Sequence, residues 1–260
     1  MRGAVAATLV FVAVGWGTIP LQVGIEQHRL QLKFGGMPVT RQMRDVLGQG
    51  LVVAVLAGFR GLAADFVWIW SHTDWEQKRW FQQYNKMQVA TLLQPRSVLF
   101  WDVGAWHMAW NIGYAERTDP SNATVAQGIK REMLWHQRAE QFLLRGIQNL
   151  PNRYELYFKL GWLYEQKFQD PCRAAEQYGL AARFADAPRY VARMHCRRLA
   201  SCGRLTEAYQ CWKRLWQQQT ATPGERQIVE RELRRLENEM DIPDSERIFP
   251  VRITQPEPSR

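Results

Sequence analysis

Apolar and small side chains recur at three- and four-residue steps through the stretch from Tyr154 to Pro188. The first half of this stretch places four such residues on one face of a helix: Tyr157, Leu160, Gly161 and Tyr164. The second half repeats the spacing with Ala174, Tyr178 and Ala181. The pattern therefore predicts two helices packed face to face, with Gly161 at the point where the second helix comes close.

The same helical spacing covers most of the chain outside this stretch. The predicted elements are two helices within 61–95, one at 98–117, a long one ending near 149, a hairpin at 189–219 and a final helix at 223–240. The last of these has a single apolar stripe and charged residues on its other sides, as expected of a helix at the end of an array. Together these elements predict an all-α fold.

Residues 189–219 repeat the arrangement of 154–188. Gly203 marks the turn, and the positions of Ala174, Tyr178 and Ala181 return as Ala208, Trp212 and Leu215. Over Tyr154–Leu215 the chain thus resembles the tetratricopeptide repeat, a helix-turn-helix unit of about 34 residues. The resemblance implies a solenoid of about four hairpins and a capping helix, spanning residues 46–240.

The amino terminus carries an uncharged apolar run. Gly3 to Ile25 has no charged side chain, and at about 1.5 Å per residue it is just long enough to cross a bilayer core. We expect residues 1–25 to form one transmembrane anchor, as in a bacterial inner membrane; the alternative is a signal peptide cleaved near Ala13. Residues 26–45 are expected to be a connector and 241–260 an extended tail with prolines. The flanking charges leave the side of the membrane open.

The composition is that of a folded, basic protein. Hydrophobic residues make up 46% of the 260, enough for a packed core, and the formal net charge is +9. Because Lys and Arg are interleaved with Asp and Glu, and no nucleic-acid-binding motif accompanies them, we expect no nucleic-acid partner. The common catalytic and phosphate-binding motifs do not occur, which favours a non-enzymatic protein without a cofactor.

The titratable residues that draw notice are expected to be structural. His72, Asp74 and Glu76 do not all share one helix face, so a three-ligand metal site is not expected. His107 lies in an aromatic-rich helix and His136 follows Trp135, and both are expected to be hydrogen-bonded helix-packing residues. Asp65 falls in an apolar stretch and is expected to form a buried ion pair with an arginine.

All four cysteines lie within the region that resembles the repeat: Cys172, Cys196, Cys202 and Cys211. Their spacing contains no CxxC pair, so we do not expect zinc. In an oxidising compartment Cys172 could pair with Cys196, or Cys196 with Cys211. The favoured interpretation is that the cysteines are small buried apolar side chains at helix contacts.

The resemblance implies an interaction module, because tetratricopeptide arrays present a concave groove to an extended peptide or a helix of a partner protein. Helical phase assigns five residues of the first helices to this groove: Glu155, Lys159, Trp162, Arg193 and Arg197. The basic members predict an acidic partner. The first hypothesis is therefore a membrane-anchored protein–protein interaction scaffold or assembly factor.

The second hypothesis is a cell-envelope enzyme, or a glycan- or lipid-binding subunit, with its site in the aromatic-rich region 66–110. Aromatic rings stack on sugars as readily as they pack on one another. The lack of clustered carboxylates weighs against glycoside hydrolysis. Neither hypothesis fixes the oligomeric state.

Overall fold

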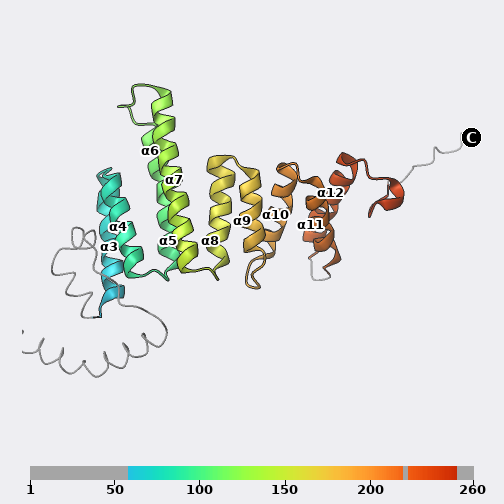
Figure 1. Cartoon of the computed structure of the whole chain (residues 1–260), viewed down its shortest axis with the longest axis horizontal. Coiled ribbons are helices and arrows are strands. Elements are labelled where there is room, and N and C mark those ends of the chain that lie inside the picture. The colour runs from blue at the N-terminus through green and yellow to red at the C-terminus, as the bar shows by residue number, and fades with distance from the viewer. Residues whose placement is uncertain (1–57, 219–221, 251–260) are drawn as a thin grey trace, which may run out of the picture. The chain divides into compact units, whose positions relative to one another are not determined.

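The computed structural model describes residues 58–218 and 222–250, and every regular element in these ranges is a helix (Figure 1). The all-α prediction is confirmed for this part of the chain. Two compact units, residues 1–94 and 95–260, divide the molecule and are described separately. The apolar run at 3–25 and the connector at 26–45 lie outside the described residues. None of the described helices has the length and apolar character that crossing a membrane requires.

The described part of the first unit is a helical hairpin of α3 (Arg60–Glu76) and α4 (Trp80–Leu93). Lys78 makes the turn in the left-handed region, at φ 55°. At the open end, the guanidinium of Arg60 donates to the carbonyl of Leu93. These contacts bring the start of α3 beside the end of α4, so the two helices are antiparallel.

A carboxylate is buried inside this hairpin, but it is not Asp65. Asp65 is exposed, so the expectation of a buried ion pair there is wrong. Asp74 is 1% exposed and accepts from Lys86 at 2.5 Å, with Arg79 at 2.7 Å. Nine residues separate Asp65 from Asp74, which at 3.6 residues per turn places them on opposite sides of α3. Helical phase thus explains which carboxylate faces α4.

The second unit begins with a continuous helical rod and goes on as a series of helices. The rod consists of α5 (Val98–Trp106), a π-helical turn η1 (His107–Ile112) and α6 (Gly113–Arg117). The next helices are α7 (Val125–Asn149), α8 (Tyr154–Leu163) with its π-helical turn η2 (Tyr164–Phe168), α9 (Pro171–Ala181), α10 (Arg189–Ser201), α11 (Leu205–Gln217), α12 (Pro223–Glu239) and the short 3₁₀ turn η3 (Asp244–Glu246).

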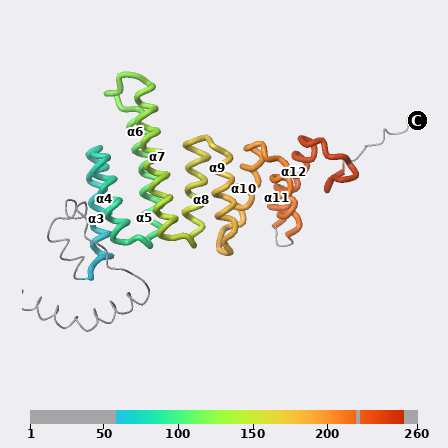
Figure 2. The backbone as a smooth tube through the Cα atoms, viewed as in Figure 1, coloured from blue at the N-terminus to red at the C-terminus, as the bar shows by residue number. Residues whose placement is uncertain are grey.

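Helices of the second unit pack mainly on their neighbours in the chain. Contacts run from α5 to α7, α7 to α8, and so on to α11 and α12, and Figure 2 shows α8 to α11 side by side in chain order. The largest fully buried side chains lie between successive helices: Trp135, Phe142, Tyr178 and Trp212. The core of this unit is therefore a strip that runs in the order of the helices.

Local signals explain where several of these helices begin. Asp170 accepts a hydrogen bond from the Arg173 amide at 2.9 Å and caps α9, whose first residue is proline. Thr222 and Glu225 form a reciprocal capping box on α12. Thr124 caps the long helix α7 by accepting from the amide of Gln127.

Residues 241–250 differ from the expected extended tail at 241–260, of which 251–260 lie outside the described residues. Phe249 packs on Trp216 with ring centroids 5.0 Å apart. The amide of Ile248 donates to the buried carboxylate of Glu237 at 2.7 Å, and Tyr209 donates to the same carboxylate at 3.1 Å. Because Glu237 offers an internal acceptor, the described residues up to 250 fold back on α11 and α12.

All four cysteines are paired, as Cys172–Cys202 and Cys196–Cys211. The interpretation as buried free thiols is wrong, and so is the pairing of Cys172 with Cys196. The alternative pairing of Cys196 with Cys211 is confirmed. The antiparallel packing of α9 and α10 explains the other bond, because it brings the start of α9 level with the end of α10, and the two Cα atoms are 5.0 Å apart.

Candidate interaction face

The residues that the sequence assigned to repeat packing lie at helix contacts. Eight of them are buried: Leu160, Gly161, Tyr164, Ala174, Tyr178, Ala181, Ala208 and Trp212. Tyr157 and Leu215 are half-buried, and Gly203 makes the turn between α10 and α11 at φ 78°. These residues hold the helices in place, so the faces that α5, α8 and α10 leave uncovered are the places to look for a partner.

Two buried tyrosines donate hydrogen bonds to carboxylates of neighbouring elements and so hold η2 in place. The Tyr178 hydroxyl donates to Glu165 at 2.8 Å, and burial together with this carboxylate raises the pKa of Tyr178 far above its usual value. Tyr164 donates in the same way to Glu140 of α7, and its pKa is raised for the same two reasons. Both hydroxyls therefore remain protonated donors at any physiological pH.

Ion pairs join α5, α8 with η2, α10 and α12 in a row, which we call the first-helix row. Lys159 of α8 contacts Asp102 of α5 at 3.1 Å, and Arg198 of α10 contacts Glu165 of η2 at 3.3 Å. Arg193 of α10 donates to Glu225 of α12 at 2.5 Å. Successive members of the row are thus tied to one another by opposite charges.

The predicted groove cations belong to this network. Lys159 and Arg193 have the partners just described, and Arg197 contacts Glu232 at 3.5 Å. Glu155 is held by Arg153, whose guanidinium lowers the pKa of the Glu155 carboxyl against the opposing effect of burial. The charges proposed to attract an acidic peptide are therefore neutralised within the protein.

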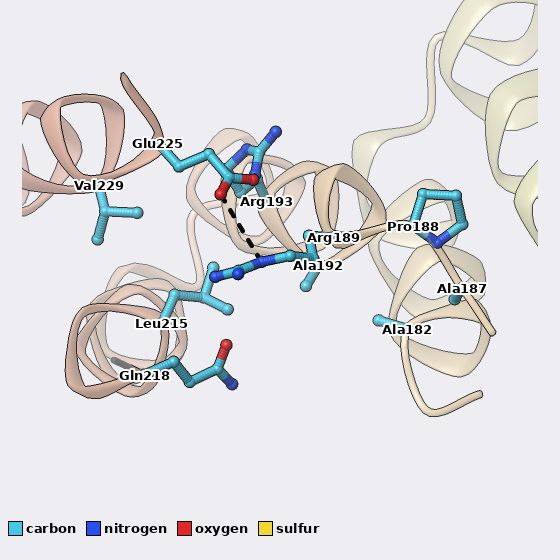
Figure 3. Close-up of a pocket in the computed structure, with 10 residues that line it drawn as sticks. All are labelled: Ala182, Ala187, Pro188, Arg189, Ala192, Arg193, Leu215, Gln218, Glu225 and Val229. Atoms are coloured by element: carbon cyan, nitrogen blue, oxygen red, sulfur yellow. Dashed lines mark hydrogen bonds and ion pairs between the residues drawn. The ribbon is translucent and has the colours of Figure 1, made fainter. Parts of the chain in front are cut away.

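Arg193 lines a small pocket of about 160 Å³ between α10, α11 and α12 (Figure 3). Arg189 lies 3.8 Å from the same Glu225 carboxylate. Leu215 and Val229 supply apolar walls. Both arginines converge on Glu225, and hydrogen bonds and the two guanidiniums lower the pKa of its carboxyl. Glu225 thus neutralises part of the positive charge of the pocket.

Trp162, the fifth predicted groove residue, stacks on Trp110. Their ring centroids are 4.5 Å apart and their planes are inclined by 17°. The ammonium groups of Lys159 and Lys167 lie over Trp162 and Trp110, at 5.6 and 5.1 Å from the centroids. Both indoles are half-buried, so part of each remains open to solvent. We call these four residues the tryptophan site.

The tryptophan site lies where both first helices contain π-helical turns. Trp110 belongs to η1, and Lys167 belongs to η2. A π turn holds an extra residue and shifts the helical phase of the residues after it, and such turns are frequent at functional sites. Sequence analysis missed Lys167, and it included Trp110 only as the end of the aromatic-rich region 66–110, because it assumed regular helical phase and could not pair either residue with Trp162.

His136 lies beneath these two turns. It is 4% exposed, which confirms the packing part of the expectation. Neither ring nitrogen meets strict hydrogen-bond geometry within the described residues, but the Ala109 backbone lies close enough to raise its pKa. Its Nε2 is 3.6 Å from Glu132, and its ring meets Phe168 of η2 edge-on. Burial lowers the pKa of His136, against an opposing contribution from Glu132. The imidazole is therefore neutral at pH 7.

The described residues bring no three His, Cys, Asp or Glu side chains together in a way that could hold a metal ion. His72 lies near Glu76 at 3.7 Å, whereas Asp74 turns toward Lys86 and Arg79. This part of the molecule is an all-helical protein with an aromatic site on one helical face. No protein-family model matches the chain, and no curated protein matches it either.

Proposed function

We propose that this protein is a membrane-anchored interaction scaffold, in which a tetratricopeptide-like solenoid binds a segment of a partner protein on the first-helix row. The repeat resemblance over Tyr154–Leu215 and the packing of helices in chain order support the solenoid. The apolar run at 3–25 supports the anchor.

The observation that carries the proposal is the stacked pair of Trp110 and Trp162. Binding energy in protein interfaces concentrates in a few aromatic and arginine anchors. Two rigid indoles, half open and 4.5 Å apart, offer such an anchor at little cost in conformational entropy. The pair thus supplies a contact surface that the neutralised charges of the first-helix row do not.

The partner segment can be inferred from the chemistry of the tryptophan site. Its anchor is an aromatic side chain or a proline, since both pack flat on an indole. An adjacent carboxylate suits Lys167, which forms no ion pair within 58–218 and 222–250. An acidic residue of the partner would thus pair with Lys167. Lys159, Arg193 and Arg197 already have partners within the protein.

The two disulfides support an oxidising location for the domain. Cytoplasmic reductants keep most thiols free, whereas disulfides persist outside the inner membrane. We therefore propose that residues 58–250 face the oxidising side of the membrane. The disulfides thereby favour one of the two orientations that the charges around the anchor leave open.

The proposal is tested by selecting short random peptides displayed on phage against the purified chain. We expect the selected peptides to share an aromatic or proline anchor beside an acidic residue. Their affinity should fall at least about tenfold for Trp162→Ala and several-fold for Lys167→Ala, which corresponds to the loss of one anchor. Tyr114→Ala, a change to a 63% exposed aromatic outside the site, is the matched control.

Selection of no peptide, or of peptides that bind Trp162→Ala as well as the parent, would contradict the proposal. An array of envelope glycans, screened with the same variants, tests the second hypothesis of a glycan-binding subunit. Glycan binding that is lost in Trp162→Ala would assign the tryptophan site to glycan binding instead. Melting temperatures of all variants should stay within a few degrees of the parent.

A further inference from the structure

A second and larger cavity opens beside the pocket of Figure 3, between α9, α10 and α11. Its volume is about 610 Å³, within the range of small-molecule sites. Six of its 14 lining residues are charged or titratable: Glu176, Arg183, His195, Arg204, Glu207 and Arg214. Neither the tryptophan site nor the ion pairs of the first-helix row use these residues.

The cavity has a net positive charge. Three arginines face two glutamates, which leaves a formal charge of +1. Arg204 and Glu207 satisfy each other through two hydrogen bonds of 2.7 and 2.5 Å. Arg183 and Arg214 form no ion pair or hydrogen bond within the described residues. Two guanidiniums are thus available to an incoming anion, and a planar fork suits a carboxylate or phosphate.

His195 is held on this wall in one tautomer. Its Nδ1 lies 2.8 Å from the carbonyl oxygen of Ala175, and because a carbonyl only accepts, Nδ1 must carry the proton. The ring rests on Gly179, where a Cβ would come within 2.8 Å of the imidazole Cε1. Burial, with Arg214 and Arg204 nearby, lowers the pKa of His195. Nε2 is therefore a hydrogen-bond acceptor at pH 7.

We propose that this cavity binds a small hydroxylated organic anion. Its phosphate or carboxylate group pairs with Arg183 and Arg214, and a neighbouring hydroxyl donates to Nε2 of His195. The combination discriminates, because a simple anion leaves the imidazole acceptor unused and a neutral sugar leaves both guanidiniums unused. The site is independent of the tryptophan site, so its test and that of partner binding can fail separately.

Isothermal titration of the full chain with glucose 6-phosphate and with glucuronate tests the site, with glucose and inorganic phosphate as the matched comparisons. We expect saturable binding of at least one of the two hydroxylated anions with a Kd of about 1 mM or lower. Glucose should not bind, and inorganic phosphate should bind at least several-fold more weakly. The Cε1 proton resonance of His195 should shift on binding.

Variants assign the contacts. Arg183→Gln combined with Arg214→Gln should weaken binding at least tenfold, whereas Arg231→Gln, an exposed arginine of α12 away from the cavity, should not. His195→Phe should weaken binding of the hydroxylated anion and leave the affinity for inorganic phosphate unchanged. Absence of binding by both hydroxylated anions up to about 10 mM, or equal binding by the double variant, would overturn the proposal. Equal affinity for inorganic phosphate would overturn the role of His195.

Discussion

Gly161 of α8 lies so close to the ring of Tyr178 of α9 that a Cβ added to the glycine would be 2.8 Å from Cδ1 of the tyrosine. The carbonyl oxygen of Ala174 would lie 3.3 Å from the same Cβ. Tyr178 is fully buried and its hydroxyl is fixed on Glu165, so the ring has little room to move. The contact between these two helices therefore depends on the absence of a side chain at residue 161.

Replacing Gly161 by alanine should destabilise the domain. The added methyl forces α8 and α9 apart, and overpacking of this kind costs about 1–3 kcal/mol. Thermal or urea unfolding measures the loss. Gly224→Ala in α12 is the control, because nothing lies within 4 Å of a Cβ there. That change should be neutral or stabilise the helix by up to about 1 kcal/mol. Equal stabilities of the two variants would contradict the prediction.

Stability should fall as the pH drops below the ordinary pKa of histidine, 6.5. Because burial lowers the pKa of His136 in the folded state, the unfolded chain binds a proton that the folded chain does not. The stabilisation is complete above pH 6.5 and is lost as the pH falls below it. Glu132 raises the pKa of His136, and the positive charges of Lys167 and Arg117 offset part of that increase.

His136→Phe should reduce the slope of unfolding free energy against pH between about pH 7 and 5, since one titrating group is removed. His195 has a lowered pKa for the same main reason, so His195→Phe should remove a separate part of the slope. Urea unfolding across the pH range gives both slopes. A pH profile of His136→Phe parallel to that of the parent would exclude the proposed role of this residue.

Lys159→Glu should weaken the domain itself, apart from any partner. The new carboxylate would face Asp102, which now lies 3.1 Å from the Lys159 ammonium. Both side chains are about two-thirds to three-quarters buried, so a loss of about 1 kcal/mol is expected. Adding Asp102→Lys restores opposite charges and should recover most of the stability. A double variant no more stable than Lys159→Glu would argue against this ion pair.

The two disulfides should differ in their response to reductant. Cys172 is exposed, whereas Cys196 and Cys211 are 0% and 6% exposed. Mild reduction of the native protein followed by alkylation and mass spectrometry should label Cys172 and Cys202 first. Removing either bond by paired substitution should cost about 3 kcal/mol, for loops of 15 and 30 residues. Labelling of all four cysteines without reductant would show that neither bond forms.

Helical phase within regular segments was predictable from the sequence. The spacing of Tyr157, Leu160 and Gly161 places them on the buried side of α8, where the structure has them buried or half-buried. The turn at Gly203 was also predictable, because its φ of 78° favours glycine. These features depend on local repetition, which the sequence records directly.

The composition of the candidate sites was harder to predict. Trp110 and Trp162 meet across two helices that each contain a π turn, and no spacing rule anticipates that change of phase. Asp102 pairs with Lys159, from which it is 57 residues away in the sequence, and leaves Lys167 to bind a partner. A charge in a sequence therefore indicates a surface but not whether the protein already neutralises it.

The disulfides interlock, because Cys196 lies inside the loop closed by Cys172 and Cys202 while its partner Cys211 lies outside it. Under tension along the chain, force passes directly from residue 172 to residue 202. The chain between them, a separation of 30 residues or about 100 Å when extended, is not released until the Cys172–Cys202 bond is reduced. The redox state of the surroundings thus decides whether α9, α10 and α11 can be pulled apart by force.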